Sequence, residues 1–466
     1  MYDDTIAAIA TPVGDGGIGI IRLSGPESAE ISSRIFRRGT SKHQVDVSRL
    51  ESHRLYYGRV IDGSRGATID EVMLVRMAAP RTYTREDVVE IHCHGGSIPT
   101  RRVLELAVAN GARLAEAGEF TLRAFLNGRL DLSQAEAVMA VVSARTPESL
   151  ELAVDELRGG LTSRLAPARS ALIDALAYLD ASADFPEDEV PPMDLGASLE
   201  MAQQALKEVL DASNLGLLFH EGVQIAIVGR PNVGKSSLMN RLLRSERAIV
   251  TDIAGTTRDV ITESINLRGI PATLLDTAGI AETRDVIEQM GIDRSRKALE
   301  SASLALFVLD SSQPAVTDDL NVANVLADRL DRDGSGRVVV ALNKVDLERR
   351  IDLEAVQALL PDVPVVEISA ASGDGIEQLE RTLYDRLASC VGDARQPATV
   401  SLRQQEALRS ALEGVRSALS ALPTGTPLDL IAIDVRDALL HIGEITGERV
   451  SESVLDEIFS RFCIGK

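Results

Sequence analysis

Residues 223–236 read Val-Gln-Ile-Ala-Ile-Val-Gly-Arg-Pro-Asn-Val-Gly-Lys-Ser, an apolar stretch that predicts a buried strand followed by a glycine-rich loop. The loop, Gly229–Ser236, fits the pattern G-x-x-x-x-G-K-[ST], whose backbone N–H groups close around a phosphate while the lysine meets its charge and the hydroxyl binds Mg²⁺. Such a loop after a strand is sometimes only a tight turn. The predicted nucleotide contacts are Asn232, Val233, Gly234, Lys235, Ser236 and Ser237, with Lys235 also catalytic and Ser236 a Mg²⁺ ligand.

Three downstream motifs, each after an apolar run, indicate that the nucleotide is GTP. The sequence Asp-Thr-Ala-Gly at 276–279 places a carboxylate near Mg²⁺ and a glycine near the γ-phosphate. In Asn-Lys-Val-Asp at 343–346, the aspartate accepts from the N1–H and exocyclic amine of guanine, an edge that adenine does not present. Residues 369–371, Ser-Ala-Ala, resemble the loop that closes over the base. The predicted contacts are Asp276, Thr277, Ala278, Gly279, Asn343, Lys344, Asp346, Ser369, Ala370 and Ala371.

The segment Thr251–Asp259 occupies the position of a first switch, where a threonine coordinates Mg²⁺ only while the γ-phosphate is present. A Ras-like enzyme places a water-orienting glutamine directly after the glycine of the 276–279 motif. Here that residue is Ile280, which cannot hydrogen-bond to water. Either a residue of the acidic stretch Glu282–Glu288 orients the water, or the chain is a slow GTPase that awaits an activator.

Composition narrows the class of protein. With 466 residues the chain has room for about three domains. Its three cysteines are widely separated, which indicates neither a disulfide framework nor a zinc site and suits a reducing cytoplasm. No apolar run approaches the length of a membrane span, so we expect a soluble, cytoplasmic protein. A net charge of −21 opposes independent affinity for nucleic acid. If nucleic acid is a substrate, we expect a partner protein to provide much of the binding affinity.

Periodicity predicts a multidomain fold of α/β and α+β parts. Residues 1–118 alternate short β-branched runs with helical stretches, which indicates an α+β domain. Residues 119–216 and 386–466 carry leucines at helical spacing, with breaks or kinks expected at Gly159-Gly160 and Pro167. Such one-sided helices need a partner, so we predict one bundle into which a Ras-like GTP-binding domain, 217–385, is inserted. Two separate helical domains are the alternative.

Motifs at both ends of the chain resemble the MnmE (TrmE) family of tRNA modification GTPases. The motif with the highest family specificity is the terminal Phe-Cys-Ile-Gly-Lys at 462–466. The other motifs that carry the resemblance are Asp4–Pro12, Gly16–Gly25, Tyr83–Asp87, His92–Gly96, Gly118–Thr121 and Ala124–Leu132.

The resemblance implies a domain organisation and a reaction. The N-terminal domain would bind a tetrahydrofolate derivative and form a constitutive homodimer, and the two GTP-binding domains would pair when GTP and K⁺ are bound. With an FAD-dependent partner, MnmG or GidA, in a heterotetramer, the enzyme would install an aminomethyl or carboxymethylaminomethyl group at C5 of the wobble uridine of tRNA. Methylene-tetrahydrofolate would supply the one-carbon unit.

The resemblance also implies site residues. A potassium ion would take the place of an arginine finger, and Glu288 would orient the water. Arg129 stands where the family has lysine, which keeps the charge but changes the donor geometry. The implied K⁺ ligands are Asn232, Thr251, Ile253 and Thr256, the Mg²⁺ ligands Ser236 and Thr257, and the folate contacts Arg22, Glu86, Arg129 and Lys466.

Two further readings remain open at this point. Cys463 is either a catalytic nucleophile or a core residue beside Phe462. His92 and His94 would share one face of a strand, and we favour cleft histidines over a metal site. At the level of function, a ribosome-assembly GTPase of the Era or Der kind and a folate-dependent transferase regulated by GTP are the alternatives.

Overall fold

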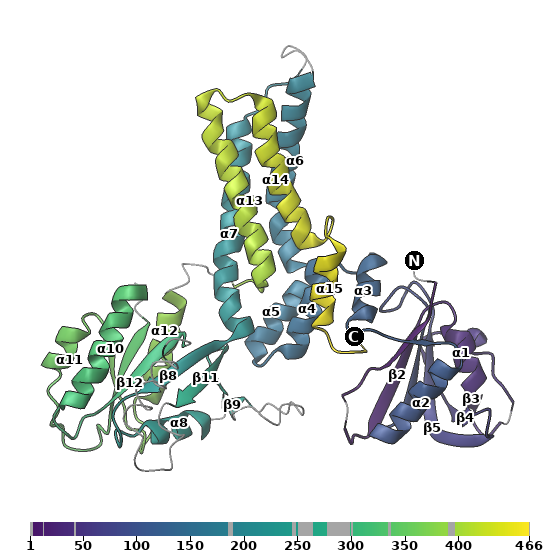
Figure 1. Cartoon of the computed structure of the whole chain (residues 1–466), viewed down its shortest axis with the longest axis horizontal. Helices are drawn as coiled ribbons and strands as arrows, with labels where there is room; N and C mark the ends of the chain where they lie inside the picture. Colours follow the sequence, from purple (N-terminus) through teal and green to yellow (C-terminus); the bar gives the residue numbers. More distant parts are fainter. Residues whose placement is uncertain are drawn as a thin grey trace. The chain divides into compact units, whose positions relative to one another are not determined.

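The computed structural model describes residues 3–12, 14–41, 43–184, 190–244, 248–249, 264–276, 299, 302–333, 337–389 and 397–465. The chain divides into two compact units, Met1–Met139 with Leu440–Lys466, and Ala140–Leu439. Figure 1 shows the elements of each unit. The division into four parts predicted from the sequence stays a prediction. The boundaries between the two units fall within the residue ranges of α4 (Leu132–Ser143) and α14 (Leu428–Thr446).

The first unit is built on a seven-stranded sheet with the order β3-β4-β5-β6-β2-β1-β7. All strand pairs are antiparallel except β1 with β7, which is parallel. The short β-branched runs predicted within residues 1–118 include 18–21, 71–75 and 88–91, and these three lie in β2, β5 and β6. The strands are β1 (Ile6–Ile9), β2 (Ile18–Ser24), β3 (Phe36–Arg38), β4 (Arg54–Asp62), β5 (Ala67–Met77), β6 (Val88–His94) and β7 (Arg113–Leu114).

Helices α1 (Ser28–Ile35) and α2 (Ser97–Ala109) cover this sheet (Figure 1). Alternation along β2 explains why they pack there, because Gly19, Ile21 and Leu23 are buried while the residues between them are not. The core under the helices includes Ile21, Leu23, Ile31, Leu74 and Val103. Burial of these side chains supplies the hydrophobic stabilisation of the unit.

The end of the chain returns to this sheet. Helices α3 (Glu119–Leu126) and α15 (Glu452–Ser460) pack together, and Phe459 and Phe462 are buried in their shared core with Leu132. Beyond α15, Ile464 forms an antiparallel bridge with Ala117. Gly465 has a φ of 97°, and a Cβ there would lie 2.3 Å from the carbonyl oxygen of Ile9. Glycine is therefore required for this close approach.

The second unit contains a doubly wound sheet with the order β14-β13-β12-β8-β11-β10-β9. The strands from β14 to β11 are parallel, and β10 and β9 extend the sheet as antiparallel strands. All four strands predicted before the nucleotide motifs are confirmed. The strands are β8 (Val223–Val228), β9 (Ala248–Ile249), β10 (Ser264–Leu267), β11 (Ile270–Asp276), β12 (Leu304–Asp310), β13 (Val338–Asn343) and β14 (Val365–Glu367).

Helices cover both faces of this second sheet. The nucleotide motifs lie in the loops at the ends of its strands. Two apolar cores form on its two faces, one around Leu306 and Val339 and the other around Phe307 and Val340. Successive residues of β12 and β13 therefore face opposite helix layers, as a parallel sheet with helices on both sides requires. The helices are α8 (Lys235–Arg244), α10 (Thr317–Asp333), α11 (Glu354–Leu359) and α12 (Ile376–Ser389).

Long helices from both sides of the GTP-binding domain form one bundle, as predicted (Figure 1). Helix α7 packs against both α6 and α13, and Gln405 donates to Asn214 at 2.6 Å. At Gly216 an added Cβ would lie 1.8 Å from the carbonyl oxygen of Ala398, so the two segments meet backbone to backbone. The bundle helices are α5 (Pro147–Leu157), α6 (Gly160–Asp184), α7 (Leu195–Glu221), α13 (Leu402–Ala421) and part of α14.

The two predicted helix breaks have different outcomes. Gly159 has a φ of 89° and separates α5 from α6, so the break there is confirmed. At Pro167 the helix does not break, because α6 continues through this residue, and the kink that the sequence also allows there stays a prediction. Packing explains the continuation: Leu161, Leu165 and Leu172 are buried on one face of α6, whereas Pro167 lies on the exposed side.

Candidate nucleotide and folate sites

The phosphate loop connects β8 to α8 and has the backbone geometry that its sequence predicts. Gly229, Asn232 and Gly234 all have positive φ, at 148°, 66° and 102°. A Cβ on Gly234 would lie 2.2 Å from Nδ2 of Asn343, so a side chain would fill the space where the two motifs meet. Ser236 and Ser237 are exposed in the first turn of α8, where helix N–H groups and the helix dipole favour an anion. The loop therefore fits a nucleotide phosphate with Mg²⁺ at Ser236.

Two lysines hold the loop from opposite sides. The ammonium of Lys235 donates to the carbonyl oxygens of Gly229 at 2.8 Å and Arg230 at 2.9 Å. The ammonium of Lys344 donates to the carbonyl oxygen of Asn232 at 2.9 Å and to Asp310 at 2.7 Å. Burial opposes ionisation of Asp310, but the bond from Lys344 lowers the pKa of this carboxyl below its usual range. Both ammonium groups thus lie against the loop that is predicted to receive phosphate.

Asn343 joins the phosphate loop to the loop expected at the base. Its Nδ2 donates to the carbonyl oxygen of Val233 at 2.8 Å, and its Oδ1 accepts from the backbone N–H of Ala370 at 3.0 Å. Asn343 is buried, so losing either bond would leave its amide N–H or its amide oxygen without a hydrogen-bond partner, from the protein or from water. Asp346 is exposed three residues further on, in the position predicted for guanine recognition.

The loop at Ser369–Ala371 is fixed by bonds that the sequence reading missed. Arg241 of α8 donates to the carbonyl oxygens of Ala370 and Ala371. The hydroxyl of Ser369 accepts from the N–H of Ser372 at 3.1 Å and closes the turn. Arg241 lies five residues after the end of the phosphate loop, and no pattern in the sequence links it to residue 370.

Several predicted site residues lie outside the described residues, and their roles stay predictions. For Asp276 the strand position is described, at the end of β11, but its side chain is not. The predicted residues outside the described part are Thr251, Ile253, Thr256, Thr257, Thr277, Ala278, Gly279, Glu288 and Lys466.

In the first unit, two of the predicted folate residues lie against one aromatic ring. The guanidinium of Arg129 lies 4.7 Å from the ring centre of Tyr83, and that of Arg22 lies 5.8 Å from the same ring. Arg129 also donates to the Tyr83 carbonyl oxygen at 3.0 Å, and Arg22 lies 5.7 Å from the Phe120 ring. Arginines held against aromatic faces suit a ligand that combines a flat ring with negative charge.

Glu86 belongs to a buried network centred on Arg123, which sequence reasoning missed. Glu86 accepts from Ser24 at 2.7 Å and pairs with Arg123 at 3.3 Å. The side chain of Arg123 is fully buried and also pairs with Asp4 and Glu119, at 2.7 and 2.9 Å. A buried guanidinium needs such partners. The sequence pattern of α3 does not distinguish Arg123 from the other residues of this helix. The network fixes the position of the Glu86 carboxylate.

The terminal motif lies beside Arg22. Nη1 of Arg22 donates to the carbonyl oxygen of Gly465 at 3.4 Å, while its Nε pairs with Glu90 at 2.9 Å. Cys463 is exposed two residues earlier, so it is not a core residue, and its catalytic role stays a prediction. Residues 443 positions apart in the chain are thus in direct contact at the predicted folate site.

His92 and His94 point to the same side of β6 but have separate partners. His92 lies 3.2 Å from Glu90, and His94 lies 2.7 Å from Asp70. Between them, Cys93 is buried, and burial raises the pKa of its thiol to about 11. Within the described residues, no group of three or more His, Cys, Asp or Glu side chains is arranged to hold a metal.

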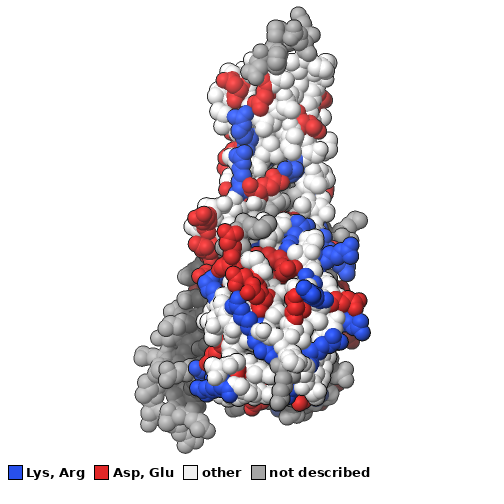
Figure 2. All heavy atoms as spheres, turned by 90° about the vertical axis from the view of Figure 1, so that its right-hand side faces the viewer, with Lys and Arg blue, Asp and Glu red and all other residues white. Residues whose placement is uncertain are grey.

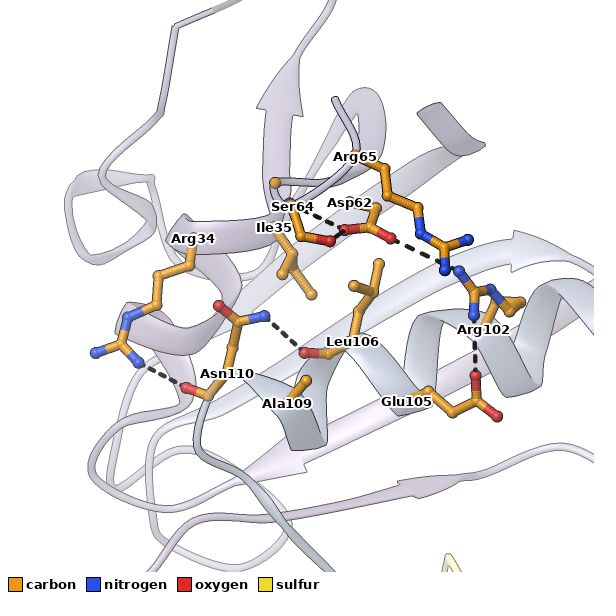
Figure 3. Close-up of a pocket in the computed structure, with 11 residues that line it drawn as sticks. Arg34, Ile35, Asp62, Ser64, Arg65, Arg102, Glu105, Leu106, Ala109 and Asn110 are labelled. Carbon is orange, nitrogen blue, oxygen red and sulfur yellow. Dashed lines mark hydrogen bonds and ion pairs between the residues drawn. The ribbon is translucent and has the colours of Figure 1, made fainter. Parts of the chain in front are cut away.

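A hollow of about 480 Å³ lies elsewhere in the first unit, between α1, α2 and the β4–β5 turn (Figure 3). Among its charged side chains, Arg102 pairs with Asp62 and Glu105, and Arg34 donates to the carbonyl oxygen of Asn110. Of the predicted folate residues that the structure describes, none lines it. The hollow is therefore separate from the site around Tyr83.

The phosphate loop at the end of β8, tied to an Asn-Lys-x-Asp loop at the end of β13, defines a P-loop GTP-binding protein. Two family models match the chain: the MnmE helical domain over residues 132–463, and the GTP-binding protein TrmE N-terminus over residues 5–129. The chain belongs to the MnmE (TrmE) family.

Curated relatives match over essentially the whole chain. The tRNA modification GTPase MnmE of Alkaliphilus oremlandii is 41% identical over 100% of both chains. The protein of the same name from Geobacillus thermodenitrificans is 44% identical over 99% of both chains, and that of Geobacter sulfurreducens is 44% identical over 100% of both. This full-length similarity favours the MnmE family over a ribosome-assembly GTPase and agrees with the multidomain α/β fold.

Solved structures show only a weak overall likeness. The GTP-binding domain of the T. maritima FeoB iron transporter has a TM-score of 0.26 and 26% identity, over 35% of this chain and 98% of that chain. An Aquifex aeolicus Era structure with GDP·AlF4⁻ has a TM-score of 0.27 and 27% identity, over 41% of this chain and 66% of that one. Separately, among the described helices none has the length and apolar character required to cross a bilayer.

Proposed function

We propose that this chain is a potassium-dependent GTPase that modifies tRNA at C5 of the wobble uridine. It would install an aminomethyl or carboxymethylaminomethyl group together with an FAD-dependent partner of the MnmG (GidA) type. The observation that carries the proposal is the contact between Arg22 and the carbonyl oxygen of Gly465. This contact joins the terminal motif to a residue proposed to bind folate, in a chain that also holds a guanine-nucleotide loop. A simple GTPase switch would have no use for a second ligand site.

The phosphate loop supports GTP hydrolysis assisted by a monovalent cation. Asn232 is exposed and held in a left-handed conformation, with its carbonyl oxygen engaged by Lys344. Its side-chain oxygen is therefore available as a K⁺ ligand, together with Thr251, Ile253 and Thr256. A cation there neutralises charge at the β–γ bridge. Ser236 and Thr257 would hold Mg²⁺, and Glu288 would orient the water in place of the residue that Ile280 replaces.

The site around Tyr83 supports binding of a tetrahydrofolate derivative. Its flat ring suits a place among Arg22, Arg129 and Tyr83, and its carboxylates suit the guanidinium groups and Lys466. Glu86, fixed by Ser24 and Arg123, would accept hydrogen bonds from the ring N–H groups. A bound folate would supply the one-carbon unit, and the exposed Cys463 would act as a nucleophile.

Charge supports the need for a partner in tRNA binding. Figure 2 shows acidic and basic side chains intermingled on the face it presents, and the chain carries a net charge of −21. Phosphate contacts supply much of nucleic-acid affinity, so this surface alone would bind tRNA weakly. A homodimer joined with MnmG in a heterotetramer, in the cytoplasm, would add the missing basic surface.

The proposal is tested by mass spectrometry of wobble nucleosides from cells that lack this chain. We expect the C5 modification to disappear, to return with the wild-type gene, and to stay absent with Lys235→Ala. Asp385→Asn, a change at an exposed position of α12, is the matched control and should restore it. Unchanged wobble nucleosides in the deletion strain would refute the proposed function.

A further inference from the structure

The first variable residue of the phosphate loop, Arg230, is anchored to a helix. Its Nε lies 3.3 Å from Oδ2 of Asp319, and its Nη2 donates to Gln313 at 3.0 Å. Phosphate binding by such a loop needs backbone N–H groups, the lysine and the hydroxyl, and it places no demand on this side chain. The contacts of Arg230 therefore serve another purpose.

Asp319 is a buried carboxylate that is fixed in position and needs a positive charge beside it. Its side chain is only 2% exposed and lies in the first turn of α10, where Oδ2 also accepts from the N–H of Val316 at 3.1 Å. Within the described residues, Oδ1 of Asp319 and Nε of Arg230 have no aligned hydrogen bond, so charge holds the pair together. A buried carboxylate without its cation is strongly unfavourable, so Asp319 requires Arg230.

The backbone of Arg230 also contacts Lys235, the lysine of the phosphate loop. The carbonyl oxygen of Arg230 accepts from the ammonium of Lys235 at 2.9 Å. Pro231 follows directly and restricts the backbone of Arg230, and Asn232 comes next with its φ of 66°. Fixing the guanidinium against α10 consequently fixes the carbonyl that receives Lys235 and the residue proposed to bind K⁺.

We propose that Arg230 and Asp319 are a positioning pair that holds the phosphate loop in the geometry needed for GTP and for the activating cation. The part that concerns GTP rests on the phosphate loop alone, and the part that concerns K⁺ rests on the proposed function. Neither side chain is among the groups with which such a loop binds phosphate, so both would act through Lys235 and Asn232.

The test uses the full chain with Arg230→Met, Arg230→Lys, Asp319→Asn and the double variant Arg230→Met/Asp319→Asn. We expect Arg230→Met to weaken GTP affinity about tenfold and to raise the K⁺ concentration for half-maximal turnover, because one partner of a buried charge pair is lost. Arg230→Lys should keep most of the affinity. The double variant should lose less than the sum of the single changes, since the two residues act as a unit.

Arg381→Met is the matched control, because it breaks an exposed arginine–glutamate pair on α12 of the same domain. It should leave both constants unchanged. Circular dichroism and thermal melts confirm folding, and if Asp319→Asn does not fold, Arg230→Met and Arg230→Lys still decide the question. Wild-type GTP affinity in folded Arg230→Met would overturn the positioning role. If wild-type turnover is equal in K⁺ and Na⁺, the cation mechanism fails, while the GTP affinities still report on the pair.

Discussion

The hydroxyl of Thr146 donates to the carbonyl oxygen of Gly269 at 2.7 Å and thereby joins the bundle to the β10–β11 turn of the GTP-binding domain. Thr146 is also the N-cap of α5 and takes part in a capping box with Ser149. Gly269 has a φ of 99°, and a Cβ there would lie 2.7 Å from the Phe219 ring. The turn precedes β11, which ends at Asp276, so the bundle contacts the strand that carries a nucleotide motif.

Thr146→Val should lower the stability of this unit. The change removes both the helix cap and the bond to Gly269, for which we expect a loss of about 1–2 kcal/mol, whereas Thr146→Ser keeps the hydroxyl and should lose much less. Denaturant unfolding followed by circular dichroism measures the difference. Thr382→Val, which removes a threonine hydroxyl on the surface of α12, is the control. Equal stability of Thr146→Val and Thr146→Ser would show that the shared hydroxyl is unimportant.

Asp346→Asn should change the base specificity. Losing two hydrogen bonds from guanine to a carboxylate should weaken GTP binding roughly a hundredfold. Xanthine carries a carbonyl in place of the exocyclic amine, and the new amide can donate to it, so XTP should bind better to the variant than GTP does. Competition against a fluorescent nucleotide gives both affinities. Asp385→Asn should keep the GTP preference, and a variant at 346 that also kept it would refute the guanine contact.

Turnover should be much faster in K⁺ than in Na⁺, and Asn232→Gly should remove the difference. Glycine is chosen because it accepts the φ of 66° at this position, so only the side-chain ligand is lost. GTP affinity measured in Na⁺ should stay within about threefold of wild type, because the backbone cradle is retained. Phosphate release in the two salts is the measurement. Equal wild-type rates in both salts would contradict cation assistance.

Gly465→Val should weaken tetrahydrofolate binding without changing GTP turnover. The new side chain would collide with the carbonyl oxygen of Ile9 and displace the terminal motif from Arg22. Because Arg22 would no longer be held beside the terminal motif, we expect the affinity for tetrahydrofolate to drop on the order of tenfold. Ile464→Ala is the control, because its side chain is exposed. Calorimetric titration with tetrahydrofolate distinguishes the two variants, and identical affinities would place the ligand away from the chain end.

Stability of the first unit should fall in acid partly through Glu119. Burial alone would raise the pKa of Glu119, but hydrogen bonds from Arg113, the backbone of Glu116 and Arg123 outweigh it and lower the pKa below its usual value of 4.5. The ionised carboxylate therefore contributes stability above about pH 4.5, and this is lost as the pH falls through the lower folded pKa. Glu119→Gln should be less stable at pH 7 and show a flatter pH profile. Parallel profiles would refute this contribution.

Much of the nucleotide site was predictable because its chemistry is local. Gly229, Lys235 and Ser236 follow a strand, and a loop between a strand and a helix can close around a phosphate with few long-range contacts. Arg241 and Asn343 show the limit of that reasoning, since their bonds to Ala370 and Val233 span 129 and 110 residues. Pro167 shows a different limit, because packing of one helix face outweighed the local preference against proline.

The amino-acid sequence by itself determined the strands, the guanine-nucleotide motifs and the order of the parts, because each depends on residues close together in the chain. Tertiary structure alone decided that Arg123 is buried among Asp4, Glu86 and Glu119, that Asp319 holds Arg230, and that Gly465 lies against Arg22. The physical reason is that burial and charge pairing depend on which segments meet in space. A charged residue looks the same in sequence whether its partner is water or a carboxylate from another element.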